Sequence, residues 1–105
     1  MKESFKAKLW VNNISIDLNP FVEEFLARTV VGAVRSLKGA EDLHSLELYL
    51  EQGRVRVVVN GDELPITPFP NDIIANTVTG LVSTLKDVGE IESLKVNIKA
   101  LEAAA

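Results

Sequence analysis

The strongest constraint on this 105-residue chain is an internal repeat. Shifting the chain by 48 residues places residues 9–52 on residues 57–100 without a gap, and 13 of the 44 aligned pairs are identical. Unrelated stretches of ordinary composition would share roughly two or three such pairs. We therefore interpret 1–100 as a single domain made of two repeats, 5–52 and 53–100. Residues 101–105 read as a tail or a cloning remnant.

Each repeat begins with a strand and a tight turn. Apolar and polar residues alternate over 5–11 and 54–59, and this period of two predicts a strand with one buried face. The dipeptides Asn12-Asn13 and Asn60-Gly61 follow. Both accept the positive φ angles of a two-residue hairpin turn, so a change of direction is expected there.

A helix and a second strand complete each repeat. Asn19-Pro20 and Thr67-Pro68 combine a capping side chain with a proline at the first helical position. Apolar residues then recur at helical spacing. The predicted buried stripes are Val22, Phe25, Leu26, Thr29, Val30, Ala33, Val34 and Leu37, and Ile73, Ile74, Thr77, Val78, Leu81, Val82 and Leu85. The closing strands are predicted at 45–51 and 93–99.

These elements predict an α+β fold with two layers, an antiparallel sheet and two helices on one of its faces. A turn at Gln52-Gly53 would join strands 45–51 and 54–59 in a register that pairs polar with polar residues. The simplest arrangement is a ferredoxin-like duplicated βαβ unit. A duplicated ββαβ unit is the alternative, because an extended segment at 62–66 would occupy the edge that strand 54–59 needs for strand 5–11.

Composition excludes several classes of chemistry. The chain has no Cys and one His, so it has no disulfide framework and no thiolate metal site. Phosphate-binding glycine loops, nucleophile elbows and zinc-ligand spacings are missing from the sequence. We predict no enzyme activity, no catalytic residue, no cofactor and no metal. Since neither a signal peptide nor a membrane-spanning segment is present, we expect a cytoplasmic protein without membrane contact.

Three further features have structural explanations. His44 is expected to be a solvated loop residue, because a lone titratable group seldom makes a site. The acids Glu23-Glu24 and Asp72 fall in the first helical turns, where the helix dipole favours negative charge. Gly32 and Gly80 occupy the same position of both predicted helices, which suggests close packing against a neighbouring element.

The polar face of the predicted sheet is the one feature that points to a function. By alternation it carries Lys6, Lys8, Trp10, Glu47, Tyr49, Glu51, Arg54, Arg56, Val58, Lys95, Asn97 and Lys99. This face holds six of the 11 basic residues, two of the 15 acidic ones, and the only Trp and Tyr. The candidate binding residues are Lys6, Lys8, Trp10, Tyr49, Arg54, Arg56, Lys95 and Lys99.

Three interpretations of this face remain open. It can be an ordinary solvated face in which Lys and Arg pair across strands. It can be a homodimer or partner interface, with Trp10 and Val58 as an apolar centre inside a charged rim. It can bind an anionic ligand, because RNA-binding sheets stack bases on rings while Lys and Arg hold phosphates. The net charge of −4 disfavours only a diffuse basic coat, not a local nucleic-acid site.

Several short motifs resemble those of a known group of sequences. They are Val59-Asn60-Gly61, Asn19-Pro20-Phe21, Thr67-Pro68-Phe69 and Ser36-Leu37-Lys38-Gly39. In these motifs the chain resembles small uncharacterised prokaryotic proteins, archaeal ones especially, over most of both repeats. The resemblance implies no functional residue. The sequence thus predicts a small non-enzymatic, homo-oligomeric binding or assembly module that uses its sheet face; the alternative is nucleic-acid or polyanion binding there.

Overall fold

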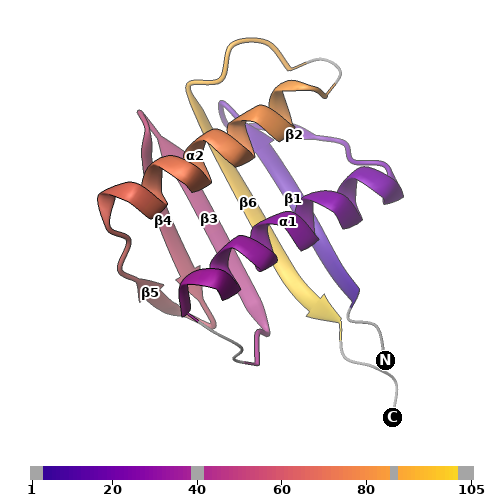
Figure 1. Cartoon of the computed structure of the whole chain (residues 1–105). Helices are drawn as coiled ribbons and strands as arrows, with labels where there is room; N and C mark the ends of the chain where they lie inside the picture. The colour runs from indigo at the N-terminus through magenta and orange to yellow at the C-terminus, as the bar shows by residue number, and fades with distance from the viewer. Residues whose placement is uncertain (1–3, 39–41, 86–87, 102–105) are drawn as a thin grey trace.

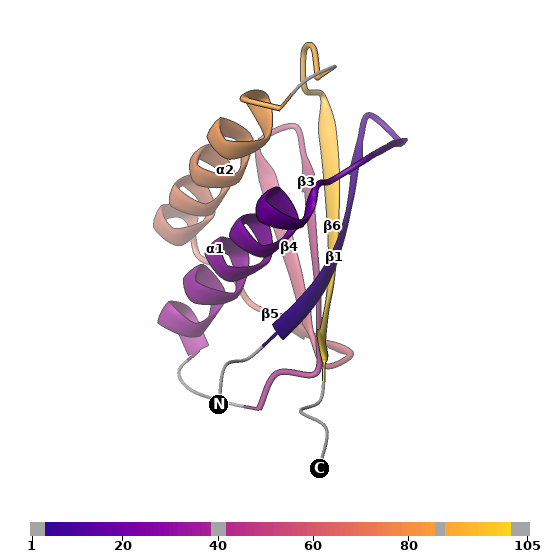
Figure 2. The same cartoon turned by 90° about the vertical axis from the view of Figure 1, so that its right-hand side faces the viewer.

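The computed structural model describes residues 4–38, 42–85 and 88–101, and within them the elements follow the order ββαβ twice. The elements are β1 (Ser4–Val11), β2 (Ile14–Ile16), α1 (Pro20–Lys38), β3 (Ser45–Glu51), β4 (Arg54–Val59), β5 (Asp62–Leu64), α2 (Pro68–Ser83) and β6 (Ser93–Leu101). Both helices cover the same face of one sheet (Figures 1 and 2). The α+β class with two helices on an antiparallel sheet is confirmed.

The strand order corrects the four-stranded ferredoxin-like expectation. The sheet runs β2-β1-β6-β3-β4-β5, and every neighbouring pair is antiparallel. β2 pairs with the outer edge of β1, and β5 pairs with the outer edge of β4. The strands β1 and β4 therefore each keep one edge free for another strand. β4 uses that edge for β3, which leaves β6 to pair with both β1 and β3. The strands β1 and β4 therefore never meet.

The three predicted hairpin turns are present where the sequence places them. Asn12 and Asn13 have φ of 51° and 67°, and Asn60 and Gly61 have 52° and 88°. Gln52-Gly53 has positive φ at both residues as well. Left-handed backbone at two consecutive residues matches the right-handed twist of the flanking strands, which is why Asn and Gly occupy these positions.

The core lies between the sheet and the helices. Alternate residues of the four long strands are buried, as the period-two pattern predicts. The helices bury Leu26, Ala27, Val30, Val31 and Val34, and Ile74, Ala75, Val78 and Val82. Part of the predicted helical stripes is wrong, because Phe25, Leu37, Ile73 and Thr77 are exposed. The buried stripe of each helix is therefore narrower than the apolar pattern.

The two helix starts use the same proline but different caps. Both helices begin at the predicted proline, Pro20 or Pro68. The Asn19 side chain accepts a hydrogen bond from the Val22 amide at 2.8 Å, so its capping role is confirmed. The Thr67 side chain makes no cap bond, which corrects that part of the prediction. Glycine commonly ends a helix, which favours a helix end at Gly39, but this residue lies outside the described residues.

The predicted close approach at the two mid-helix glycines is wrong. Gly32 and Gly80 are exposed, and a Cβ added at either position would meet nothing within 4 Å. Glycine in a helix interior costs about 1 kcal/mol relative to alanine. The monomer alone therefore gives no physical reason for glycine at either position.

The identical Asn12 and Asn60 tie the two repeats together. The Asn12 side chain donates to the Glu90 carbonyl at 2.8 Å. Its Oδ1 accepts from the amides of Glu92 and Ser93 at 2.8 and 3.0 Å. The turn of the first repeat therefore holds the segment that leads into β6 of the second repeat.

Asn60 makes the equivalent contacts from the second repeat to the first. Its side chain donates to the Asp42 carbonyl at 2.8 Å, and its Oδ1 accepts from the amides of His44 and Ser45 at 2.7 and 3.0 Å. Each repeat thus holds the start of the other repeat's last strand. We call these two sets of hydrogen bonds the asparagine clamps.

A second equivalent pair of contacts closes the outer edges of the sheet. The Ala7 amide lies beyond the end of β2 and donates to Glu23 Oε2 at 2.9 Å. At the same repeat position, the Val55 amide donates to Asn71 Oδ1 at 2.7 Å. The helix dipole is therefore only part of the reason for Glu23, because its carboxylate also satisfies a strand amide that β2 leaves unpaired.

We predict that Asn12→Gly and Asn60→Gly each lower the free energy of unfolding by roughly 1–3 kcal/mol. Glycine keeps the positive φ and removes the clamp, so the loss reports the side-chain hydrogen bonds. Asn13→Gly is the matched control, because it makes the first turn resemble Asn60-Gly61. Urea unfolding measures all three, and equal losses for Asn12→Gly and Asn13→Gly would contradict the clamp.

Candidate binding face

The open side of the sheet, opposite the helices, carries all eight candidate residues. The strand register places on it Lys6, Lys8, Trp10, Tyr49, Arg54, Arg56, Lys95 and Lys99. We call this side the sheet face. The fold brings these residues together from β1, β6, β3 and β4, the four long strands.

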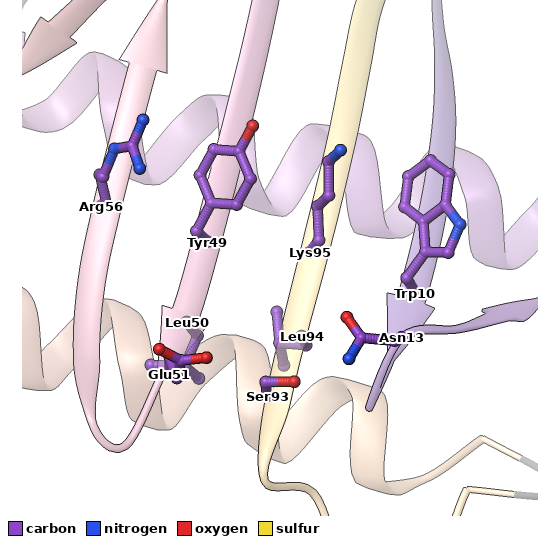
Figure 3. A pocket seen from close by; sticks show the side chains of 9 residues that line it. All are labelled: Trp10, Asn13, Tyr49, Leu50, Glu51, Arg56, Ser93, Leu94 and Lys95. Atoms are coloured by element: carbon purple, nitrogen blue, oxygen red, sulfur yellow. The ribbon is translucent and has the colours of Figure 1, made fainter.

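Aromatic rings and cations alternate in one row across the sheet face. Trp10 lies opposite Lys95, Lys95 opposite Tyr49, and Tyr49 opposite Arg56. Lys95 Nζ lies 5.0 Å from the centroid of the Trp10 ring and 5.5 Å from that of Tyr49. The Arg56 guanidinium lies 5.0 Å from the Tyr49 centroid. Figure 3 shows this aromatic–cation row, in which each cation is held against a ring face.

A hollow of about 500 Å³ lies along this row. Its lining residues are Trp10, Asn13, Tyr49, Leu50, Glu51, Arg56, Ser93, Leu94 and Lys95 (Figure 3). Asn13, Glu51 and Ser93 add amide, carboxylate and hydroxyl groups at one end of the hollow. The hollow therefore presents two aromatic rings, together with the two cations that contact them, to a planar or anionic group.

Three lysines form a second feature of the sheet face. Lys6 lies directly opposite Lys99, and Lys8 is two residues further along β1 on the same side. All three are exposed, and none makes an ion pair within the described residues. We call these residues the lysine cluster. Like charges directly opposite on neighbouring strands are destabilising, so this arrangement costs the free protein stability.

Two of the three acidic residues of the sheet face, Glu47 and Glu63, contact a polar or basic side chain. Tyr49 donates its hydroxyl hydrogen bond to Glu47, and Glu51 lies opposite Arg54. Glu63 Oε1 lies 3.3 Å from Arg56 Nε, and sequence reasoning missed this residue. The two-residue turn Asn60-Gly61 could have predicted its position, because such a turn places Glu63 opposite Val58 and so on the sheet face.

Residues 4–38, 42–85 and 88–101 are the part of the chain that the structure describes. In these ranges no three His, Asp or Glu side chains lie close enough to hold a metal ion. No helix there is long and apolar enough to cross a membrane. His44 is exposed, and its backbone amide and carbonyl bond Asn60 and Ala100. Comparisons with protein-family models, curated proteins and solved structures gave no match.

The phenol of Tyr49 has a raised pKa. The main cause is its hydrogen bond to Glu47, with smaller contributions from burial and the negative charge of Glu47, while Arg56 acts in the opposite direction. A group whose pKa is higher in the folded than in the unfolded chain stabilises the fold at pH values below its ordinary pKa. This contribution is lost as pH rises through the folded-state pKa.

We predict that Glu47→Gln lowers the pKa of Tyr49 towards its ordinary value, because the carboxylate that opposes ionisation is removed. Ultraviolet titration of the phenol measures this directly, since Tyr49 is the only tyrosine in the chain. Glu51→Gln is the control, because it removes the same charge from the same face without touching the hydroxyl. A Tyr49 pKa that moves equally in both variants would contradict the hydrogen bond.

Proposed function

We propose that this protein is a small non-enzymatic binding module whose sheet face holds an anionic partner. The observation that carries the proposal is the lysine cluster, in which Lys6 and Lys99 face each other and no carboxylate pairs with them among the described residues. An anionic partner would turn this repulsion into charge-assisted contacts.

The distribution of charge supports the same choice. The chain has 11 basic and 15 acidic residues, yet the sheet face has six basic residues and three acidic ones, Glu47, Glu51 and Glu63. The rest of the molecule is correspondingly acidic. A local positive face on an acidic protein attracts anions to one side and repels them elsewhere.

The sheet face fits a second copy of itself less well. A homodimer with Trp10 and Val58 at its centre would bring the six cations of one copy against the six of the other. Like-charge juxtaposition across an interface costs several kcal/mol, so an anion is the better partner for this surface.

Single-stranded nucleic acid is the polyanion that would use both features of the face. Its bases can stack on Trp10 and Tyr49 while its phosphates meet the lysine cluster. Trp10 is the fourth residue after Lys6 in β1, about 13 Å along the strand, so one extended ligand can reach both. A polyanion without rings would use only the cations.

We predict that single-stranded RNA changes the fluorescence of Trp10, the only tryptophan, with an affinity that falls steeply as salt rises. Lys99→Gln should weaken this binding several-fold. The matched control is Arg28→Gln, because it removes one positive charge from α1 on the other layer. Equal effects of these two variants, or no binding at low salt, would sink the proposal.

Inorganic polyphosphate, titrated in parallel, separates the two kinds of polyanion. If bases stack on the ring, Trp10→Ala weakens RNA binding roughly tenfold or more and leaves polyphosphate binding unchanged. If the cations alone hold the ligand, Trp10→Ala affects neither, and the ligand is a polyanion without a stacking requirement. Filter binding or fluorescence anisotropy serves for the Trp10→Ala chain, because its intrinsic signal is lost.

A further inference from the structure

The outer surface of the two helices exposes apolar side chains at equivalent positions. Phe21 and Phe69 are 73% and 74% exposed, and Phe25 and Ile73 are 50% and 48% exposed. The rings of Phe21 and Phe25 lie 6.0 Å apart. The repeat aligns Phe21 with Phe69 and Phe25 with Ile73, so both helices carry this feature at the same place. These side chains contribute little to the core of the monomer.

The glycines lie on the same side of the helices as the phenylalanines. Gly32 follows Phe21 by 11 residues, and Gly80 follows Phe69 by 11 residues. Eleven residues are close to three helical turns, so each pair shares one side of its helix, about 16 Å apart along the axis. Each helix therefore presents a ring at one end of a stripe and bare backbone at the other. We call these surfaces the phenylalanine–glycine stripes.

Equal spacing makes the stripes self-complementary. α1 and α2 run in opposite directions across the sheet (Figure 1). When two such helices meet antiparallel, a phenylalanine of each can lie over the glycine of the other, because both carry the same 11-residue offset. A two-fold axis that crosses a helix midway between its phenylalanine and its glycine satisfies this condition for that helix and its copy. The missing Cβ atoms provide room for the rings.

We propose that two copies of this chain form a homodimer through their helix layers, with Phe21 and Phe69 of each copy packed over the glycines of the other. This inference is independent of ligand binding on the sheet face and leaves that face open. It explains why glycine occupies two exposed helical positions where the monomer would be more stable with any other helix former.

Charge and area agree with a second copy as the occupant. The charges beside the stripe of α1 compensate each other, because Arg28 Nη2 lies 3.2 Å from Glu24 Oε1. The helix layer lacks the excess of cations that would repel two sheet faces from each other, because α1 and α2 together hold three basic and three acidic residues. These are Arg28, Arg35 and Lys38, and Glu23, Glu24 and Asp72. At roughly 200 Å² for a large apolar side chain, the four exposed fractions leave about 500 Å² per copy in water. This is more than half of the roughly 800 Å² per partner of a standard interface.

Sedimentation equilibrium tests the proposal on the full chain. We expect a mass of twice 11.5 kDa that dissociates on dilution. Gly32→Leu with Gly80→Leu should weaken the dimer by tenfold or more, because leucine fills the space of the rings. The same variant should unfold at or above the wild-type temperature in dilute, monomeric solution, because leucine is the better helix former. Weakened association without loss of stability distinguishes an interface from a damaged fold.

Two control variants locate the interface. Ser83→Leu adds a leucine at the exposed end of α2, beyond the overlapping stripes, and should leave the dimer intact. Trp10→Glu changes the sheet face and should also leave it intact. A single 11.5 kDa species at every concentration overturns the proposal. A dimer that survives the double leucine variant also overturns it. If Trp10→Glu dissociates the dimer, the interface is the sheet face and the proposal is again overturned.

Discussion

The structure depends on the pairing of β6 with both β1 and β3. This pairing places the last strand of the second repeat between the two long strands of the first. β3 lies in the same way between β6 and β4, so each repeat supplies a central strand to the other. The asparagine clamps hold the start of both central strands from the opposite repeat. Neither repeat can complete its sheet alone, and one core results.

Interleaving also creates the sheet face. In the aromatic–cation row, Trp10 and Tyr49 come from the first repeat, and Lys95 and Arg56 come from the second. The lysine cluster is built in the same way, because β1 and β6 belong to different repeats. The contacts of Lys95 with Trp10 and Tyr49 therefore join residues far apart in the sequence, and the backbone pairing that closes the sheet also positions these side chains.

The two repeats differ at the aromatic positions of the sheet face. The repeat mate of Trp10 is Val58, and that of Tyr49 is Asn97. The clamp asparagines, the helix-start prolines, the pair Phe21 and Phe69, and the two mid-helix glycines are instead identical between repeats. Different residues on the sheet face suit an asymmetric partner, whereas identical stripes on the helix layer suit a symmetric one. The two layers thus fit two separate roles, ligand binding and self-association.

The local structure of this protein was readable from the sequence. The period-two pattern, the turn dipeptides and the prolines predict the four long strands, the three hairpin turns and both helix starts, because these features depend on neighbouring residues. The same alternation identifies the residues of the sheet face. Only the tertiary structure decided the strand order, because the available edges of β1 and β4 depend on long-range pairing. The tertiary structure also decided that Lys6 lies opposite Lys99, because Lys99 belongs to the other repeat. It decided as well that Gly32 faces solvent and not a neighbouring element.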